Sequence, residues 1–194
     1  MDRKEGRNER LVLLTPHIGE LARLLDKPLD DVKKNAVPYA LEFAQANNCY
    51  VLAKSCASFL ATPKGLIIYP PRGSPALAKG GSGDILVGAI SARTAIAIKS
   101  AISGRSPYDG NYLSGDYYKL FPKEILSAAG AFSLEELHKQ VPVELAFLEG
   151  IVRGYHLFAE ASHVAVESSK SEENLLAKEI IEAMKAEKEN GSMA

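Results

Sequence analysis

The chain has 194 residues, a formal net charge of −1 and a pI near 6.4, so it is long enough for one domain with a substantial core. This near-neutral balance argues against nucleic acid as an obligate partner. We expect no membrane partner either, because no stretch approaches the roughly 18 uncharged apolar residues of a membrane span and the first residues do not resemble a signal peptide.

The two cysteines, Cys49 and Cys56, form no Cys-x-x-Cys pair and give little support to zinc or thioredoxin-type chemistry. Two thiols in a chain of this kind are most simply reduced and partly buried. We therefore expect a cytoplasmic protein without a metal-binding residue set.

Short apolar runs alternate with helical patterns in the first third of the chain. Residues 11–14 are wholly apolar, as in a buried strand of a parallel sheet. Thr15-Pro16 after it predicts a helix start, with Thr15 as the N-cap and Pro16 at the first helical position. The next helical stretch, residues 31–47, contains Pro38, which predicts a kink or a restart just before it.

Three further apolar runs, residues 50–53, 58–61 and 66–69, are typical of strands. Residues 62–65, Thr-Pro-Lys-Gly, form a turn pattern between the second and third of them. Because strands and helices alternate, the sequence predicts an open α/β sheet.

The segment Gly80-Gly81-Ser82-Gly83-Asp84 is the most informative in the chain. Its glycines let the backbone turn tightly and approach a ligand closely. An apolar helical segment follows to about residue 102, so its free N–H groups and positive dipole end would point at an anion, most often a phosphate. We expect this apolar helix to be buried.

Asp84 adds a carboxylate to this predicted phosphate site, which suggests phosphoryl transfer to a hydroxyl whose proton Asp84 accepts. The alternative is a glycine-rich turn with Asp84 as a helix cap. Two familiar motifs are excluded, because a Walker A loop needs Gly-Lys-Ser/Thr and the dinucleotide fingerprint needs glycine where Leu86 stands.

Beyond the apolar helix the pattern changes. Residues 103–142 read as a loop-rich insertion with one short helix, and residues 143–166 as a second, largely apolar helix. Ser169-x-x-Glu172 predicts a capping box for the last helix. Residues 185–194 are charged and predict a disordered tail.

Three segments, in order, resemble the signatures of the ADP/ATP-dependent NAD(P)H-hydrate dehydratases, a family of the ribokinase-like superfamily. Residues 15–20, Thr-Pro-His-Ile-Gly-Glu, resemble the family's Thr-Pro-His-Pro-Gly-Glu, and residues 51–58 resemble its Val-Leu-Lys-Gly-x-x-Thr strand. Residues 74–84 resemble its Asn-Pro-x-Met-Ala-x-Gly-Gly-Thr-Gly-Asp loop. The likeness covers roughly residues 11–108 and resumes weakly over 144–182.

The resemblance implies a single, partial ribokinase-like domain over residues 1–194: a three-layer α/β sheet with helices on both faces, lacking the N-terminal part of the domain. It further implies repair of hydrated NADH or NADPH. ADP or ATP phosphorylates the C6 hydroxyl, phosphate leaves and the normal cofactor is restored, with Mg²⁺ neutralising the transferring group.

Site residues follow from the resemblance position by position. His17 would line the hydrated nicotinamide site, and Asp84 would be the catalytic residue at the substrate hydroxyl. The residues implied to bind the adenine nucleotide are Lys54, Ser55, Cys56, Ala57, Ser58, Gly80, Gly81, Ser82 and Gly83.

Simpler interpretations remain open for single residues. His17 at a helix start would serve equally as a cap, and Glu20 is more typical of a first-turn helix charge than of a catalyst. Lys54 beside a buried strand favours a phosphate partner, because lysine is rarely buried alone.

Two rival functions also remain: another ribokinase-like kinase acting on a sugar, pyrimidine or thiazole alcohol, and a truncated, non-catalytic nucleotide-binding module. The chain is either a fragment or a naturally short or split form of the domain. Its sheet would then have an edge beside residues 11–14 that a missing N-terminal half or a homo-oligomer contact would cover.

Overall fold

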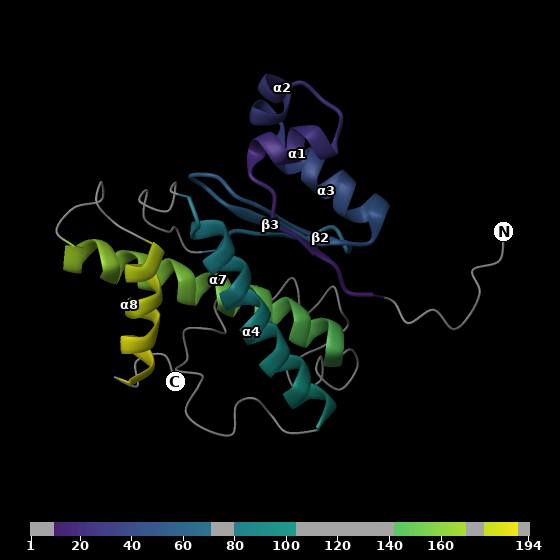
Figure 1. The fold of residues 1–194 in the computed structure, drawn as a ribbon. Helices are drawn as coiled ribbons and strands as arrows, with labels where there is room; N and C mark the ends of the chain where they lie inside the picture. Colours follow the sequence, from purple (N-terminus) through teal and green to yellow (C-terminus); the bar gives the residue numbers. More distant parts are fainter. Residues whose placement is uncertain (1–9, 71–79, 104–141, 170–176, 190–194) are drawn as a thin grey trace. The chain divides into compact units, whose positions relative to one another are not determined.

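The computed structural model describes residues 10–70, 80–103, 142–169 and 177–189, shown as coloured ribbon in Figure 1. The chain divides into two compact units, Met1–Tyr69 and Pro70–Ala194. The predicted insertion at 103–142 lies almost wholly outside the described residues.

The first unit is a four-stranded sheet with three helices. The strand order is β1-β2-β3-β4. Its elements are β1 (Leu13–Leu14), α1 (Ile18–Leu24), α2 (Leu29–Lys34), α3 (Ala36–Asn47), β2 (Tyr50–Ala53), β3 (Phe59–Ala61) and β4 (Ile67–Ile68).

The sheet is mixed, and the parallel pairing expected for residues 11–14 is confirmed for β1 and β2. Only β1 and β2 are parallel, with the helices α1–α3 between them in sequence. The β2–β3 and β3–β4 pairs are antiparallel. The cause is connection length, because a parallel pair needs a crossover of a dozen or more residues whereas a short turn suffices for an antiparallel one. The turn at residues 62–65 is such a connection, closed by Gly65 with φ of 89°.

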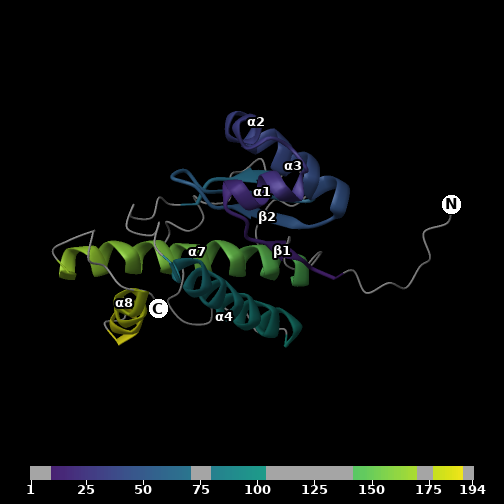
Figure 2. The ribbon, with the colours of Figure 1, turned by 45° about the horizontal axis from the view of Figure 1, so that its top comes forward.

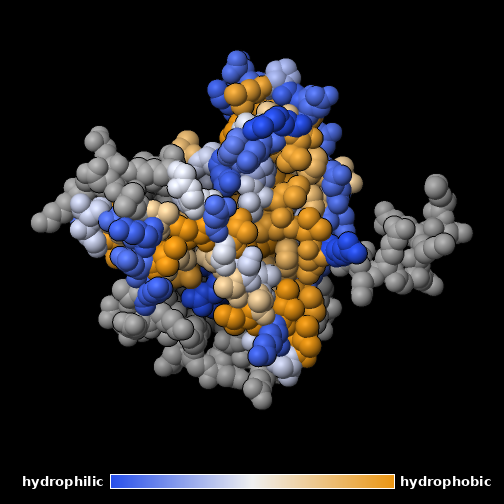
Figure 3. Space-filling model, in the orientation of Figure 1, coloured by the Kyte–Doolittle hydropathy of each residue, from blue (hydrophilic) through white to orange (hydrophobic). Residues whose placement is uncertain are grey.

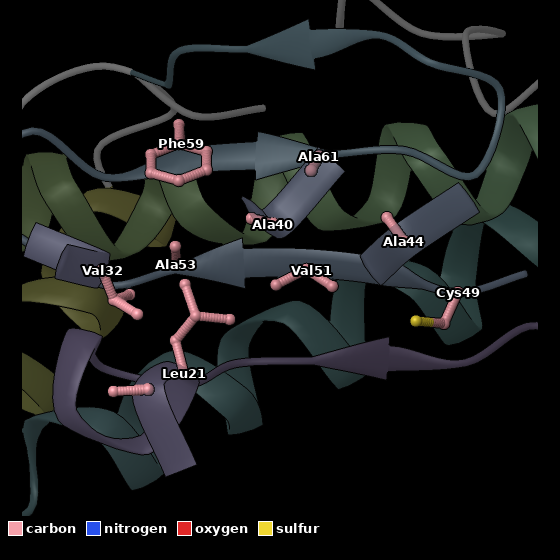
Figure 4. Close-up of a cluster of buried hydrophobic side chains, with 10 residues drawn as sticks. Leu21, Val32, Ala40, Ala44, Cys49, Val51, Ala53, Phe59 and Ala61 are labelled. Carbon is pink, nitrogen blue, oxygen red and sulfur yellow. The ribbon is translucent and has the colours of Figure 1, made fainter. Parts of the chain in front are cut away.

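One face of this sheet packs against the three helices, as Figure 2 shows. Alternate residues Val51 and Ala53 of β2, and Phe59 and Ala61 of β3, point to this face, since side chains alternate along a strand. Leu52 and Leu60, on the opposite face, are also buried. The helix-side core is drawn in Figure 4 and comprises these four residues with Leu21, Ala22, Val32, Ala40, Ala44 and Cys49.

The predicted break in the second helical stretch is confirmed at Asn35, between α2 and α3. The Asn35 amide nitrogen Nδ2 donates to the Asp31 carbonyl (3.3 Å) and to its carboxylate (2.9 Å). Pro38 is then the third residue of α3, a position whose N–H has no acceptor within a helix in any case. Proline therefore fits the first turn of the new helix rather than kinking an old one.

The second unit contains three described helices: α4 (Ser82–Ile102), α7 (Pro142–Ser169) and α8 (Ala177–Glu189). Helix α4 is not buried all round as expected. Leu86, Ile90 and Ala97 are buried, whereas Ile96 and Ile102 are 57% and 72% exposed. Figure 3 accordingly shows hydrophobic residues at the surface in the region of α4.

By length and composition alone, α4 is apolar enough to cross a membrane, although no membrane span was expected from the sequence. This is weak evidence, because a core helix of a globular protein can pass the same test. Part of this apolar surface is covered by α7, because Ile90 and Thr94 of α4 meet Gly154 and Gly150.

Helices α4 and α7 approach each other very closely. A Cβ atom placed on Gly150 would lie 2.3 Å from the Thr94 Cα, and one on Gly154 would lie 2.4 Å from the Ile90 Cα. Real Cβ atoms are essentially never so close to backbone, so both positions of α7 require glycine. Within α7, an ion pair links consecutive turns: the carboxylate of the buried Glu149 lies 2.7 Å from Arg153 Nε.

One expectation for the C-terminal part is corrected, and one stays a prediction. The Ser169 hydroxyl, at the end of α7, donates to the Val166 carbonyl (3.1 Å), but Glu172 lies outside the described residues, so the capping box stays a prediction. Helix α8 continues to Glu189, five residues into the stretch expected to be disordered. The residues of this stretch, Lys, Ala and Glu, are good helix formers, which explains why the helix continues.

Candidate functional site

Two of the sequence motifs meet at the carboxyl ends of β1 and β2. The Lys54 N–H donates to the Pro16 carbonyl (2.8 Å), and His17 and Lys54 form a parallel bridge that extends the β1–β2 pairing. In open α/β sheets ligands bind in the crevice at the carboxyl ends of the strands. The structure thus brings together His17 and Lys54, two of the predicted site residues, at an edge suited to a ligand.

His17 is the N-cap of α1, so the expectation that Thr15 caps this helix was wrong. His17 Nδ1 accepts a hydrogen bond from the Glu20 N–H (3.0 Å), and Glu20 Oε2 accepts one from the His17 N–H (2.7 Å). Threonine is a preferred N-cap and histidine is not, so the sequence pattern predicted the wrong cap. The two residues form a reciprocal capping box.

A backbone hydrogen bond and nearby basic side chains act on the Glu20 carboxylate. Its pKa is lowered from the ordinary value of 4.5, chiefly by the hydrogen bond from the His17 backbone and further by His17, Lys54 and Arg23 nearby. The imidazole is about half exposed, and its Nε2 lies 3.4 Å from Glu20 Oε1. Glu20 is therefore ionised and engaged with His17, a role that goes beyond the simple first-turn charge expected from the sequence.

The loop after β2, predicted to hold a nucleotide, is folded on itself by its two serines. The Ser58 hydroxyl accepts from the Ser55 N–H (3.2 Å) and donates to the Ser55 carbonyl (3.0 Å). The Ser55 hydroxyl accepts from the Ala57 N–H (3.1 Å). Cys56 at the tip of this loop is a free, exposed thiol, whereas Cys49 is buried and burial raises its pKa. The loop is thus a compact turn that presents Lys54 at its start.

An open, shallow pocket of about 460 Å³ lies beside this edge. Helix α1 contributes Glu20, Arg23 and Leu24, and the end of β1 contributes Leu14, Thr15 and Pro16. His17 does not line it, so the pocket flanks the His17–Lys54 edge rather than containing it.

The glycine segment belongs to the second unit. Helix α4 begins at Ser82, with Gly81 as its N-cap at φ of 86°, a left-handed conformation that favours glycine. Asp84 is exposed in the first turn. The predicted helix start is therefore confirmed, with the positive end of the helix dipole at the segment and a carboxylate on its first turn. Residues 74–79 of this motif lie outside the described part of the chain.

The part of the chain that contains these motifs matches known proteins. Residues 2–105 match the profile of the NAD(P)H-hydrate dehydratase family. A bifunctional NAD(P)H-hydrate repair enzyme from Thermofilum pendens is 44% identical over 80 residues, 41% of this chain and 15% of that protein. An ADP-dependent (S)-NAD(P)H-hydrate dehydratase from Bacillus subtilis is 38% identical over 84 residues, 43% of this chain and 30% of the relative.

The fold agrees with that of a solved relative. The ADP/ATP-dependent NAD(P)H-hydrate dehydratase from Bacillus subtilis, co-crystallised with ATP and Mg²⁺ and soaked with CoA, matches with a TM-score of 0.59 at 22% identity. The match covers 95% of this chain and 50% of that one, so the chain spans half of the solved structure and less than a third of the curated relatives named above. The family match extends over more than half of the residues, and the chain belongs to the NAD(P)H-hydrate dehydratase family.

Proposed function

We propose that this chain provides the nucleotide and catalytic half of an ADP- or ATP-dependent enzyme that dehydrates hydrated NADH and NADPH. The observation that supports this most directly is the junction of His17 and Lys54 at the carboxyl ends of β1 and β2 in a member of this family. In this proposal Asp84 accepts the proton of the substrate hydroxyl as that oxygen attacks the terminal phosphoryl group of the nucleotide. Loss of phosphate then restores the normal cofactor.

The binding roles divide between the two motif regions. Lys54 and the turn from Ser55 to Ser58 hold the nucleotide, with the ammonium beside the phosphates, and His17 contacts the hydrated nicotinamide. The glycine segment, Gly80 to Gly83, contributes backbone N–H groups to phosphate oxygens. The half-buried position of Lys54 next to the β2 end supports its share of this proposal.

Mg²⁺ fits this site as a companion of the nucleotide. Among the described residues, no three His, Cys, Asp or Glu side chains gather into a metal site. Mg²⁺ commonly binds through one or two carboxylates together with substrate phosphates, so a single exposed carboxylate such as Asp84 is compatible with it. When bound, the ion would offset negative charge on the phosphoryl group.

Adenine nucleotide is expected to raise the melting temperature of the chain, because a ligand that binds only the folded state stabilises it by mass action, by about 2.7 kcal/mol at a hundred times its Kd. Lys54→Ala should reduce this shift by removing a phosphate contact. Lys33→Ala, at an exposed position of α2, is the matched control and should leave the shift unchanged. Differential scanning fluorimetry with ADP or ATP and Mg²⁺ measures it, and a chain that shows no shift at millimolar nucleotide has no working nucleotide site.

A second candidate, a non-catalytic nucleotide-binding module, is favoured by one observation: the chain spans 50% of the solved relative. This module would show the same thermal shift without turnover. The other rival, a different ribokinase-like kinase, predicts phosphorylation of an alcohol substrate without its dehydration, and a substrate screen separates the two.

We also propose that the outer edge of β1 is covered in the working protein, by a second copy of the chain or by the N-terminal half of the domain. Strand β1 is the end strand of the described sheet, and Val12 and Leu24 beside it are 40% and 48% exposed. Exposed strand edges with apolar neighbours favour pairing with another chain. Sedimentation velocity is expected to show self-association, and a compact monomer with full activity would contradict this.

The two free cysteines support a cytoplasmic location.

A further inference from the structure

The imidazole of His17 is held by both residues that complete the Thr-Pro-His-Ile-Gly-Glu motif. The Glu20 N–H donates to the ring nitrogen Nδ1 (3.0 Å), while the Glu20 carboxylate accepts from the His17 backbone N–H (2.7 Å). Gly19 lies against the ring itself, because a Cβ atom at this position would be 3.1 Å from His17 Cε1 and 3.3 Å from His17 Nδ1. Such contacts are tighter than nine in ten real Cβ contacts, so a larger residue would shift the ring by a few tenths of an ångström. The absence of a side chain at Gly19 is therefore part of how the ring is placed.

This arrangement determines which ring nitrogen carries the proton. Nδ1 accepts the Glu20 N–H at 3.0 Å, and a nitrogen that accepts a hydrogen bond has no proton of its own. The proton of the neutral ring is then on Nε2. The nearest carboxylate oxygen, Glu20 Oε1, is 3.4 Å from Nε2, which is long for a hydrogen bond, and the side chain is about half exposed. The Nε2–H group therefore remains accessible to a ligand.

We propose that Gly19 and Glu20 are positioning residues that hold His17 as a neutral Nε2–H tautomer, so that His17 acts on the substrate as a fixed hydrogen-bond donor and not as a proton acceptor. The inference rests on the proposed function in its last part, the contact with substrate. Both nitrogens of the neutral ring are then committed, Nδ1 to the helix and Nε2 to its proton. No lone pair is left for general-base chemistry, which leaves that task to a carboxylate.

Basic side chains also lie near the Glu20 carboxylate. Glu20 is on the same helix as Arg23, and Lys54 approaches from the end of β2. Arg23 Nε also donates to the Gly19 carbonyl (3.3 Å), which ties the backbone of the motif to the next turn of α1. The carboxylate is thus surrounded by positive groups and stays ionised beside the ring.

Nitrogen NMR of the full chain without ligand tests the positioning directly. We expect His17 Nδ1 to resonate as an unprotonated nitrogen, Nε2 as a protonated one, and a coupling across the hydrogen bond to link Nδ1 to the Glu20 amide nitrogen. Gly19→Ala should weaken or abolish that coupling. Glu20→Ala should weaken it too, and Glu20→Gln should restore it, because glutamine also completes a capping box. Glu42→Gln, an exposed site on α3, is the control that should change nothing. A protonated Nδ1, or an unchanged coupling in Gly19→Ala and Glu20→Ala, would overturn the proposal.

The donor role is tested separately with His17→Asn. Asparagine is a preferred N-cap, so this variant should keep its melting temperature while losing affinity for the hydrated cofactor about tenfold or more, as loss of a hydrogen bond commonly does. Unchanged affinity in this variant would overturn the donor role even if the NMR result holds. If the wild-type chain does not bind hydrated cofactor at all, the proposed function and the donor role fail, whereas the tautomer is still decided by the spectra.

Discussion

Asp84→Asn is expected to lower the rate of hydrate dehydration by about a hundred-fold or more, the usual loss when a general base is removed. Asparagine has nearly the same size as aspartate but cannot accept the hydroxyl proton. Asp84 is exposed on the first turn of α4, so the change should disturb neither core nor fold. Affinity for ADP or ATP should change little, because the backbone of the glycine segment stays in place.

Steady-state kinetics of the wild-type and variant chains, in a form that turns over, measure this effect, and nucleotide titration measures the affinity. Asp30→Asn is a matched control, since Asp30 also lies in the first turn of a helix and is exposed. It should leave the rate unchanged. Full turnover by Asp84→Asn would show that the proton goes elsewhere and that Asp84 is only a first-turn helix charge.

Gly150→Ala is expected to lower the free energy of unfolding by about 1–3 kcal/mol or more, the range for overpacking a well-packed interface. The added methyl group would meet the backbone of α4 at Thr94, with the Cα 2.3 Å and the backbone nitrogen 2.7 Å away. Backbone atoms of a packed helix cannot rotate aside as a flexible side chain can. The two helices would have to separate, losing contacts along their length.

Gly88→Ala is the control for this prediction because Gly88 is also helical, but a Cβ there meets nothing within 4 Å. Alanine should stabilise the helix at this position by about 0.5–1 kcal/mol. Urea denaturation of the three chains gives the comparison. Equal stability of Gly150→Ala and wild type would mean that α4 and α7 are not packed as closely as the structure has them.

The strands and the break between α2 and α3 could be predicted because each depends on local chemistry. Apolar runs such as residues 50–53 are buried wherever they pair, and Pro38 admits few helical positions. Strand direction was harder to predict, because apolar composition does not distinguish parallel from antiparallel pairs. The short connections around residues 54–58 and 62–66 hold that information, since they are too short for a parallel crossover.

The error at the start of α1 comes from a side chain that can form more than one kind of contact. Thr15 has the usual chemistry of an N-cap, yet the His17 ring reaches the Glu20 N–H and takes the position. The capping box predicted at Ser169 is not tested in this way, because its partner Glu172 lies outside the described residues. Local patterns of this kind depend on which competing hydrogen bond forms, and that is decided by the surrounding fold.

The identities of the site residues could be predicted from the sequence, but their positions relative to one another could not. The motif residues His17, Lys54 and Asp84 were identified from the sequence, and the structure places the first two at adjoining strand ends and the third on the first turn of α4. The roles of Gly19 and Glu20 were missed because each has an ordinary local explanation, as a small residue and as a first-turn charge. The signal was their fixed place after the histidine in a single motif.

Repair of hydrated NADH is the most direct measurement of the central claim, that this chain carries the nucleotide and catalytic half of a hydrate dehydratase. The chain is assayed alone and as a lengthened chain that includes the N-terminal part of the domain, each with and without ADP or ATP and Mg²⁺, by the return of NADH absorbance. We predict nucleotide-dependent recovery by the lengthened chain and its loss in Asp84→Asn. No recovery by a folded lengthened chain that binds nucleotide, or equal recovery without nucleotide, would contradict the claim.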